Sequence, residues 1–238
     1  MKKTILKTKN RFFVSMLILS ISFVTATILI PARLAWAETP EEKAQKEADN
    51  KKKEDAKKAV EAQKRLADWH KRAEESIRYK FDRFKKSTLI VADGEKVRSQ
   101  SEIMSMMGDL FLGPDATVGG EVKKDTNPAA VPDTVQLFFW ANAKEEASLL
   151  YSNSKELNFL VDGKPMGPYP VKYSYGPDSD HFLENMIADV PLSDFRKIAT
   201  SKESTEGRLG EMEFKFNDYQ KILYRTFLTR ISPGVPAK

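Results

Sequence analysis

The 238-residue sequence contains no cysteine. Without thiols the chain has no disulfide, no thiolate metal site, no cysteine nucleophile and no N-terminal cysteine for lipid attachment. Only two histidines are present, His70 and His181. Imidazole chemistry in the globular part of the chain would therefore depend on His181 alone.

The motifs of several enzyme classes are also missing from the sequence. It has no Gly-x-Gly-x-x-Gly and no Walker loop, so nucleotide-dependent chemistry is poorly supported. No Gly-x-Ser-x-Gly elbow accompanies His181, which a Ser-His-Asp hydrolase would have to recruit. A pair of catalytic carboxylates for glycoside cleavage remains an open alternative, because the two residues of such a pair meet in the folded structure and have no fixed spacing in the sequence. We predict no cofactor.

The sequence has little excess charge once its first segment is set aside. Six of its 39 Lys and Arg residues lie in residues 1 to 37, which contain no Asp or Glu. The remaining chain carries 33 basic and 34 acidic residues, a balance of about −1. Nucleic-acid binding needs a clustered excess of cations, so we predict no nucleic-acid partner.

Residues 1–37 have the layout of a secretory signal peptide. Five cations precede an uncharged apolar run from Phe12 to Ile30, and the small-residue end Ala35-Trp36-Ala37 follows. This order predicts export to the periplasm or beyond, with cleavage after Ala37. The alternative is an uncleaved membrane anchor, because the run is close to the roughly 20 residues that span a bilayer.

A long charged helix is expected over residues 38–86. From Pro40 to Lys86 the chain is rich in Ala, Glu, Lys, Gln and Arg, and it has no Gly and no further Pro. Acid-before-base pairs four residues apart, such as Glu54 and Lys58, recur and favour a solvated helix. Its composition is similar to that of the spacer in the envelope protein TolA.

The second half of this expected helix has an apolar stripe that can dock on a partner surface. The stripe consists of Leu66, Trp69, Ala73, Ile77, Phe81 and Phe84. It either packs on the protein's own downstream domain or forms a coiled coil with a second chain, which would make a homo-oligomer.

Residues 87–231 are expected to form one α+β domain, and residues 232–238 a flexible tail. The alternating apolar patterns predict a mostly antiparallel, sandwich-like sheet with short helices and a C-terminal helix. Asp93-Gly94 and Asp162-Gly163 are expected to be hairpin turns. A short helix is expected from Ser101 to the stop at Gly113-Pro114, and a capping box of Asn217 with Gln220 to begin the last helix.

Three segments of this domain resemble a module that recurs in exported bacterial proteins without an assigned activity. They are Leu157-Asn-Phe-Leu-Val-Asp-Gly-Lys, Val190-Pro-Leu-Ser-Asp-Phe-Arg-Lys-Ile-Ala and Glu206-Gly-Arg-Leu-Gly-Glu-Met-Glu-Phe. The resemblance covers roughly residues 134 to 230. It implies a fold but no catalytic residue, because the matched positions are hairpin glycines and apolar core residues.

The segment Gly-Pro-Asp-Ser-Asp-His contains the one polar cluster that could bind a metal. Asp178, Asp180 and His181 supply ligands suited to zinc or manganese. The plainer interpretation is a polar hairpin loop, in which Asp and Ser bond to nearby backbone amides.

A second candidate surface is aromatic. Trp140, Tyr169, Tyr173 and Tyr175 could form a platform for sugar rings or a peptide, or they could fill the core and its rim. The leading hypothesis from the sequence is an exported, non-catalytic binding or adaptor module that engages an envelope protein or a cell-wall component. The alternatives are a metal- or carboxylate-dependent hydrolase and a structural homo-oligomer joined through the N-terminal helix.

Overall fold

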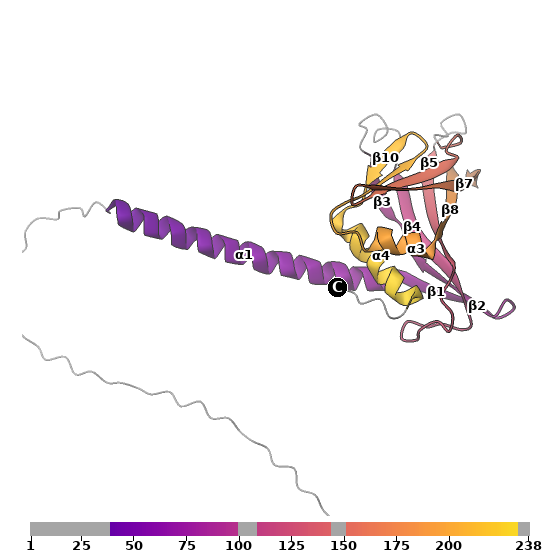
Figure 1. The fold of residues 1–238 in the computed structure, drawn as a ribbon, viewed down its shortest axis with the longest axis horizontal. Helices are drawn as coiled ribbons and strands as arrows, with labels where there is room; N and C mark the ends of the chain where they lie inside the picture. The colour runs from indigo at the N-terminus through magenta and orange to yellow at the C-terminus, as the bar shows by residue number, and fades with distance from the viewer. Residues whose placement is uncertain (1–38, 100–108, 144–150, 233–238) are drawn as a thin grey trace, which may run out of the picture. The chain divides into compact units, whose positions relative to one another are not determined.

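The computed structural model describes residues 39–99, 109–143 and 151–232 (Figure 1). The expected signal peptide at 1–37, the start of the helix expected from Ser101 and the tail after Ser232 lie outside the described residues. Contacts divide the chain into two compact units, Met1–Lys51 and Lys52–Lys238. Element labels follow Figure 1.

Helix α1 runs from Pro40 to Glu75. A capping box begins it, because Thr39 Oγ1 accepts the Glu42 N–H at 3.2 Å and the Glu42 carboxylate accepts the Thr39 N–H at 3.0 Å. Every helical residue as far as Asp68 is exposed, and Ala73 is the first buried one. Among the described residues, no helix combines the length and the apolar character needed to cross a bilayer.

The helix ends earlier than the sequence pattern predicted. Residues Ile77–Asp82 form strand β1, which pairs antiparallel with β2 (Ser87–Ala92). The predicted continuation of the helix to Lys86 is therefore wrong. Ile77, Tyr79 and Phe81 also alternate with polar residues, and strand pairing prevails because every residue of β1 has a partner on β2. The sheet thus begins before Ser87, the predicted domain boundary.

The remaining strands complete an antiparallel sheet of ten strands within the described residues. They are β3 (Glu95–Ser99), β4 (Leu110–Gly119), β5 (Thr134–Ala143), β6 (Glu156–Val161), β7 (Lys164–Asp178), β8 (His181–Pro191), β9 (Thr205–Leu209) and β10 (Met212–Lys215). Pairing runs through β4, β3, β10, β9, β6, β7, β8 and β5, and β5 pairs with β4 again. The sheet therefore closes on itself, and β2 and β1 extend it from β4.

The Asp93-Gly94 pair bends a strand instead of making the predicted hairpin. Strands β2 and β3, on either side of it, both pair with β4: Val91 lies opposite Asp115 and Glu95 opposite Leu112. Gly94 has no positive φ, which a type I′ hairpin turn would require. The chain therefore continues along β4 after a bend.

Gly113-Pro114 lies inside β4, so the predicted helix stop at this position is wrong. It falls opposite the bend, between the residues of β4 that pair with β2 and those that pair with β3. Proline lacks an N–H for a ladder and is tolerated where a neighbouring strand interrupts its pairing. A Cβ at Gly113 would meet the Ala92 carbonyl oxygen at 2.6 Å, so only glycine allows the bend to pack this closely.

The predicted hairpin turn at Asp162-Gly163 is confirmed. Asp162 and Gly163, with φ of 48° and 75°, connect β6 and β7. The Asp162 carboxylate also accepts the backbone N–H groups of Lys202, Glu203 and Ser204 at 2.8 to 3.1 Å, and these bonds hold its pKa below the ordinary value. Gly210, with φ of 59°, connects β9 and β10.

Helices α3 (Leu192–Ala199) and α4 (Asp218–Ile231) pack against the sheet and lie side by side in Figure 1. The predicted capping box begins α4: Asn217 Oδ1 accepts the Gln220 N–H at 2.8 Å, and Gln220 Oε1 accepts the Asn217 N–H at 2.9 Å. The predicted α+β class, with a mostly antiparallel sheet, short helices and a C-terminal helix after an N-terminal helix, is confirmed.

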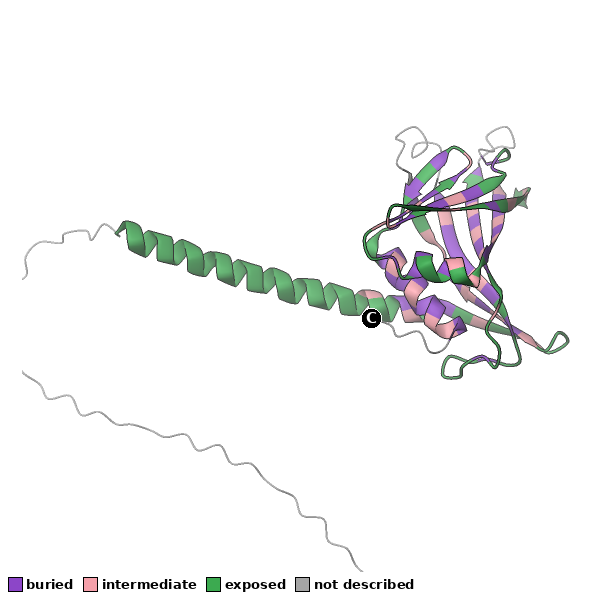
Figure 2. Cartoon of the chain, in the orientation of Figure 1, coloured by how far each residue is buried: buried purple, intermediate pink, exposed green. Residues whose placement is uncertain are grey.

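The core lies between the inner face of the sheet and these two helices, where Figure 2 shows buried residues along the strands and α4. Aromatic rings join the parts: Phe139 contacts Phe214, whose neighbour Phe216 has its ring centroid 4.8 Å from that of Tyr224 on α4. Phe195 of α3 stacks on Tyr224 at 5.5 Å. This packing occupies one face of β5 and leaves the opposite face for a site.

Candidate functional site

A pocket of about 630 Å³ lies on the face of the sheet opposite the core. Residues of β5 alternate between the two faces: Leu137, Phe139 and Ala141 are buried in the core, while Phe138 and Trp140 line the pocket. The bend between β2 and β3, the middle of β4 and the β7–β8 hairpin supply the other walls. The volume is within the range of about 300–1,000 Å³ typical of small-ligand sites.

The indole of Trp140 forms the aromatic wall of this pocket. It stacks on Phe111 of β4 with ring centroids 5.4 Å apart and planes 13° apart, and it contacts Phe138 at 5.6 Å. Phe111 and Trp140 are directly opposite each other in the β4–β5 register. The outer edge of the six-membered ring of the indole lies against Gly94, so the ring contacts both the bend and its aromatic neighbours.

An amide oxygen beside Trp140 has no hydrogen-bond partner. Asn185 of β8 is the cross-strand partner of Trp140 and also lines the pocket. Its Oδ1 is buried and receives no hydrogen bond from the described residues. A buried acceptor without a donor is costly, so such an atom is expected to be satisfied by water or by a bound ligand.

A half-buried carboxyl group lines the same pocket at Asp115 on β4. Burial, together with the negative charge of Asp189, raises the pKa of Asp115 to about 6. Asp189 itself stays ionised, because hydrogen bonds from Lys172 Nζ and Gln136 Nε2, both 2.8 Å long, lower its pKa. Asp115, Gln136 and Asp189 are successive partners across β4, β5 and β8, which explains their proximity.

Asp178, Asp180 and His181 lie in the tight β7–β8 hairpin, in which Asp178 and His181 face each other. His181 Nδ1 is 2.9 Å from Asp180 Oδ1, and His181 Nε2 is 3.7 Å from Asp178 Oδ2. The hydrogen bond to His181 lowers the pKa of Asp180, whose side chain is 94% exposed. Within the described residues, no three His, Asp or Glu side chains are grouped to hold a metal ion.

The predicted aromatic platform is divided between the two faces of the sheet. Tyr173 shares a cross-strand row with Met186 and the core residue Phe139, so it lies on the face opposite Trp140. Its hydroxyl donates to the buried Glu184 at 3.0 Å, and the Tyr169 hydroxyl donates to Asp194 at 3.1 Å.

Tyr175 stands beside Tyr173, with ring centroids 6.1 Å apart, and is 48% exposed. The three tyrosines therefore lie in the core or at its rim. Of the four residues of the predicted aromatic platform, only Trp140 lines the pocket.

The residues predicted for helix docking have separate locations. Ala73 is buried and Trp69 packs beside the core, so the end of α1 docks on the protein's own domain. Arg72 lies 4.5 Å over the Tyr219 ring, and Glu74 pairs with Arg230 of α4. Ile77 and Phe81 belong to β1 instead of the helix, Phe84 follows them in a turn, and Leu66 is 46% exposed.

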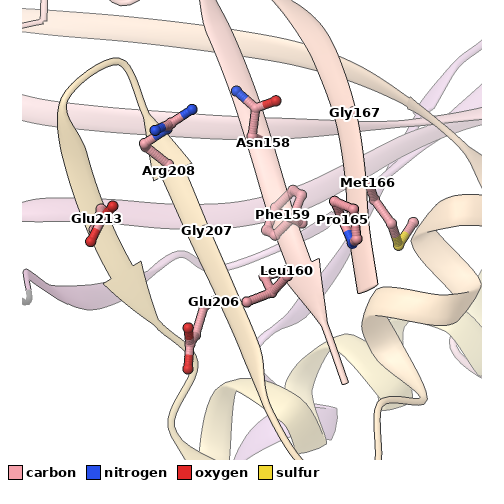
Figure 3. A pocket seen from close by; sticks show the side chains of 10 residues that line it. All are labelled: Asn158, Phe159, Leu160, Pro165, Met166, Gly167, Glu206, Gly207, Arg208 and Glu213. Atoms are coloured by element: carbon pink, nitrogen blue, oxygen red, sulfur yellow. The ribbon is translucent and has the colours of Figure 1, made fainter. Parts of the chain in front are cut away.

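A second pocket, of about 430 Å³, lies over strands β6, β7, β9 and β10 (Figure 3). Asn158, Arg208 and Glu213 occupy neighbouring cross-strand positions on its floor. Leu160 and Met166 add apolar surface. This alternation of charged and apolar side chains is typical of a solvated sheet face, so this pocket is the weaker candidate.

Sequence reasoning missed Asp115, Asn185 and Gly94 as site residues. Two of them had a local signal: Asp115 follows Gly113-Pro114 after an apolar run, and Asn185 is one of three polar residues in the otherwise apolar segment from Phe182 to Val190. Their convergence depends on strand order and register, which bring β4, β5 and β8 side by side. The structure joins Trp140 with Asp178 and His181 in one pocket, although the sequence placed them in two unrelated candidate sites.

Comparisons with known proteins found no relative, so a functional assignment depends on the geometry of the pocket beside Trp140. No protein-family model matches the chain, and no curated protein or solved structure is significantly similar to it.

Proposed function

We propose that the protein is an exported, non-catalytic binding module whose pocket takes a sugar ring of a cell-wall component. The observation that carries the proposal is the buried, unpartnered Asn185 Oδ1 beside the indole of Trp140. A sugar ring presents polarised C–H groups on its face and hydroxyl donors at its edge. The C–H groups would pack on the Trp140 indole, and a hydroxyl would donate to Asn185 Oδ1.

The charged groups of the pocket favour a ligand that donates hydrogen bonds. Asp93, Asp115 and Asp178 all line it. The guanidinium of Arg78, which also lines it, already donates to Asp93 at 2.7 Å. A phosphate or carboxylate ligand would meet these carboxyl groups unfavourably, whereas neutral hydroxyl groups would find acceptors.

Export is supported by the basic, apolar and small-residue order of residues 1–37. In that compartment, cell-wall glycans are available ligands and nucleotides are not. The lack of nucleotide motifs agrees with this assignment.

The test is a titration of the protein with soluble oligosaccharides of N-acetylglucosamine. Binding is measured by tryptophan fluorescence and by calorimetry. A Trp69→Phe background makes Trp140 the reporter in the chain after residue 37. Asn185→Leu should weaken binding by about ten-fold, because the ligand hydroxyl loses its acceptor. Trp140→Ala should weaken it further by removing the stacking surface.

The matched control is Asn158→Leu, which makes the same change at another half-buried strand asparagine, in the second pocket. It should leave binding unchanged. Absence of oligosaccharide binding by the wild-type chain, or an equal loss in both asparagine variants, would contradict the proposal.

A second candidate, a carboxylate-dependent hydrolase, is favoured by one specific observation. Asp115, with its pKa of about 6, can hold a proton near neutral pH, and Asp178 supplies a second carboxylate to the same pocket. If the chain hydrolyses an oligosaccharide, Asp115→Asn should abolish turnover and keep binding. Turnover that is unchanged in Asp115→Asn and in His181→Ala would exclude this candidate.

A further inference from the structure

The hairpin between β1 and β2 ends in a short, well-defined turn. The last paired residues are Asp82 and Ser87, and four residues, Arg83 to Lys86, connect them. The Asp82 carboxylate accepts the backbone N–H groups of Phe84 and Lys85 at 2.9 and 3.1 Å. Gly120 donates its N–H to the Lys86 carbonyl at 2.8 Å and ties the turn to the adjacent loop.

The hairpin end carries a concentrated positive charge. Lys80, Arg83, Lys85 and Lys86 are all exposed, and none forms an ion pair with a described residue. Asp82 is the one acidic residue of this segment, and its carboxylate oxygen faces the backbone of the turn. The outward-facing charge of the hairpin end is therefore positive.

Two aromatic side chains accompany these cations. Phe84 is 85% exposed at the centre of the turn, and Phe81 is 41% exposed on the adjoining strand. Arg83 lies 5.0 Å over the Phe84 ring. The end of the hairpin is exposed in Figure 2, so aromatic and cationic side chains share one solvent-facing surface.

We propose that this hairpin end docks the protein on an anionic phospholipid bilayer. Phe84 would enter the interfacial region, with Phe81 at its edge, while the four cations contact lipid phosphates. The charge complementarity and the exposed ring select this partner.

A protein partner fits this surface less well than a bilayer does. A specific protein interface needs about 800 Å² from each partner. A projecting four-residue turn with one central ring offers much less area, and its residues line neither of the two pockets described above. A bilayer needs no complementary shape, and it offers many phosphates at once.

Vesicle co-sedimentation tests the proposal with the chain that begins at Glu38. This form keeps every residue of the described core and omits the cationic, apolar segment at 1–37, which would bind lipid by itself. Vesicles of phosphatidylglycerol and phosphatidylcholine in equal parts should bind the protein, and vesicles of phosphatidylcholine alone should not. Binding should decrease as salt rises, because salt screens exposed charges.

Two variants remove the two chemical parts of the surface. Replacing Arg83, Lys85 and Lys86 with serine should weaken binding roughly a hundred-fold, about five-fold for each cation. Phe84→Ser should weaken it roughly ten-fold. Asp82 is kept in both, so the turn retains its backbone hydrogen bonds, and circular dichroism confirms the fold.

Matched controls make the same changes on α1. Lys52, Lys57 and Lys64 replaced with serine give the same net charge as the triple variant, and Val60→Ser removes an apolar side chain that is 65% exposed. Both controls should sediment like the wild type. Equal binding to the two vesicle types, wild-type binding by the hairpin variants, or equally strong binding to soluble polyglutamate would overturn the proposal.

Discussion

The indole of Trp140 lies directly on the backbone of Gly94. A Cβ at residue 94 would come within 1.8 Å of the indole Cη2 and 2.3 Å of Cζ3. The strand bend at Asp93-Gly94 and the aromatic wall of the pocket therefore determine each other. The residue pair that resembled a hairpin turn in the sequence serves to seat a tryptophan ring.

Gly94→Ala should displace this ring. Overpacking of this kind typically costs about 1–3 kcal/mol of unfolding free energy. Chemical denaturation would measure this loss, and a shift in Trp140 fluorescence would report the displaced ring. The control is Gly176→Ala, a strand position where a Cβ would meet nothing within 4 Å. Equal stability of the two variants would contradict the described contact.

Asp115→Asn should stabilise the protein at pH 8 and change little at pH 4. The pKa of Asp115 is raised from 3.8 to about 6 in the folded chain, chiefly by burial. The unfolded chain therefore ionises first, and the penalty on folding grows between these two values and is complete above pH 6. The gain at pH 8 should be about 2 kcal/mol after allowance for solvent screening.

Denaturant midpoints at the two pH values would measure the effect of Asp115→Asn. Asp189→Asn is the comparison of opposite sign, since hydrogen bonds from Lys172 and Gln136 lower the pKa of Asp189. That variant should destabilise the protein at pH 8. A stabilising effect of Asp115→Asn that is as large at pH 4 as at pH 8 would exclude the electrostatic cause.

Glu184→Ala should be strongly destabilising. Glu184 is 1% exposed, and its Oε1 accepts the Tyr151 backbone N–H at 2.9 Å and the Tyr173 hydroxyl at 3.0 Å. Truncation leaves the buried Tyr151 N–H and the half-buried Tyr173 hydroxyl without this acceptor, at a cost of about 2–4 kcal/mol.

Thermal unfolding would compare Glu184→Ala with Glu184→Gln, which keeps an acceptor oxygen and should lose less stability. The exposed strand residue Glu213 provides the matched glutamate, and Glu213→Ala should change the unfolding free energy by less than about 0.5 kcal/mol. Similar losses at both glutamates would refute the assigned role of Glu184.

Asn217→Ala should lower the unfolding free energy by about 1 kcal/mol, because the Gln220 N–H at the start of α4 loses its acceptor. Urea denaturation would measure the change. Asn217→Asp keeps a side-chain acceptor and should remain close to the wild type. A loss of equal size in both variants would indicate a role for Asn217 other than capping.

Two predictions from local sequence signals are confirmed, whereas the Asp93-Gly94 turn, also a local signal, is not. The Asp162-Gly163 turn and the Asn217-Gln220 capping box each depend on residues within one turn, so neighbouring residues were enough to identify them. The prediction that the helix continues through the β1 segment is wrong because the local pattern there was ambiguous. Ile77 and Phe81 fit both helical and strand spacing, and the choice depended on a partner strand.

The candidate site could be predicted only in part. Trp140, Asp178 and His181 were identified as polar or aromatic candidates from their residue types, but in separate groups. Tyr173 and Trp140 were grouped together, although the β5–β8–β7 register places them on opposite faces. A strand alternates its faces with every residue, so a grouping across strands needs the register, which a single sequence does not carry.

The sequence by itself determined the absence of thiol chemistry, the N-terminal helix, the α+β class, the Asp162-Gly163 turn and the cap of α4, because each follows from composition or from contacts between near neighbours. Tertiary structure alone decided the closure of the sheet through the β4–β5 pairing, the bend at Gly94 and the meeting of Trp140, Asn185 and Asp115 in one pocket. These features depend on hydrogen bonds between strands distant in the chain, and their free energy depends on which strands become neighbours.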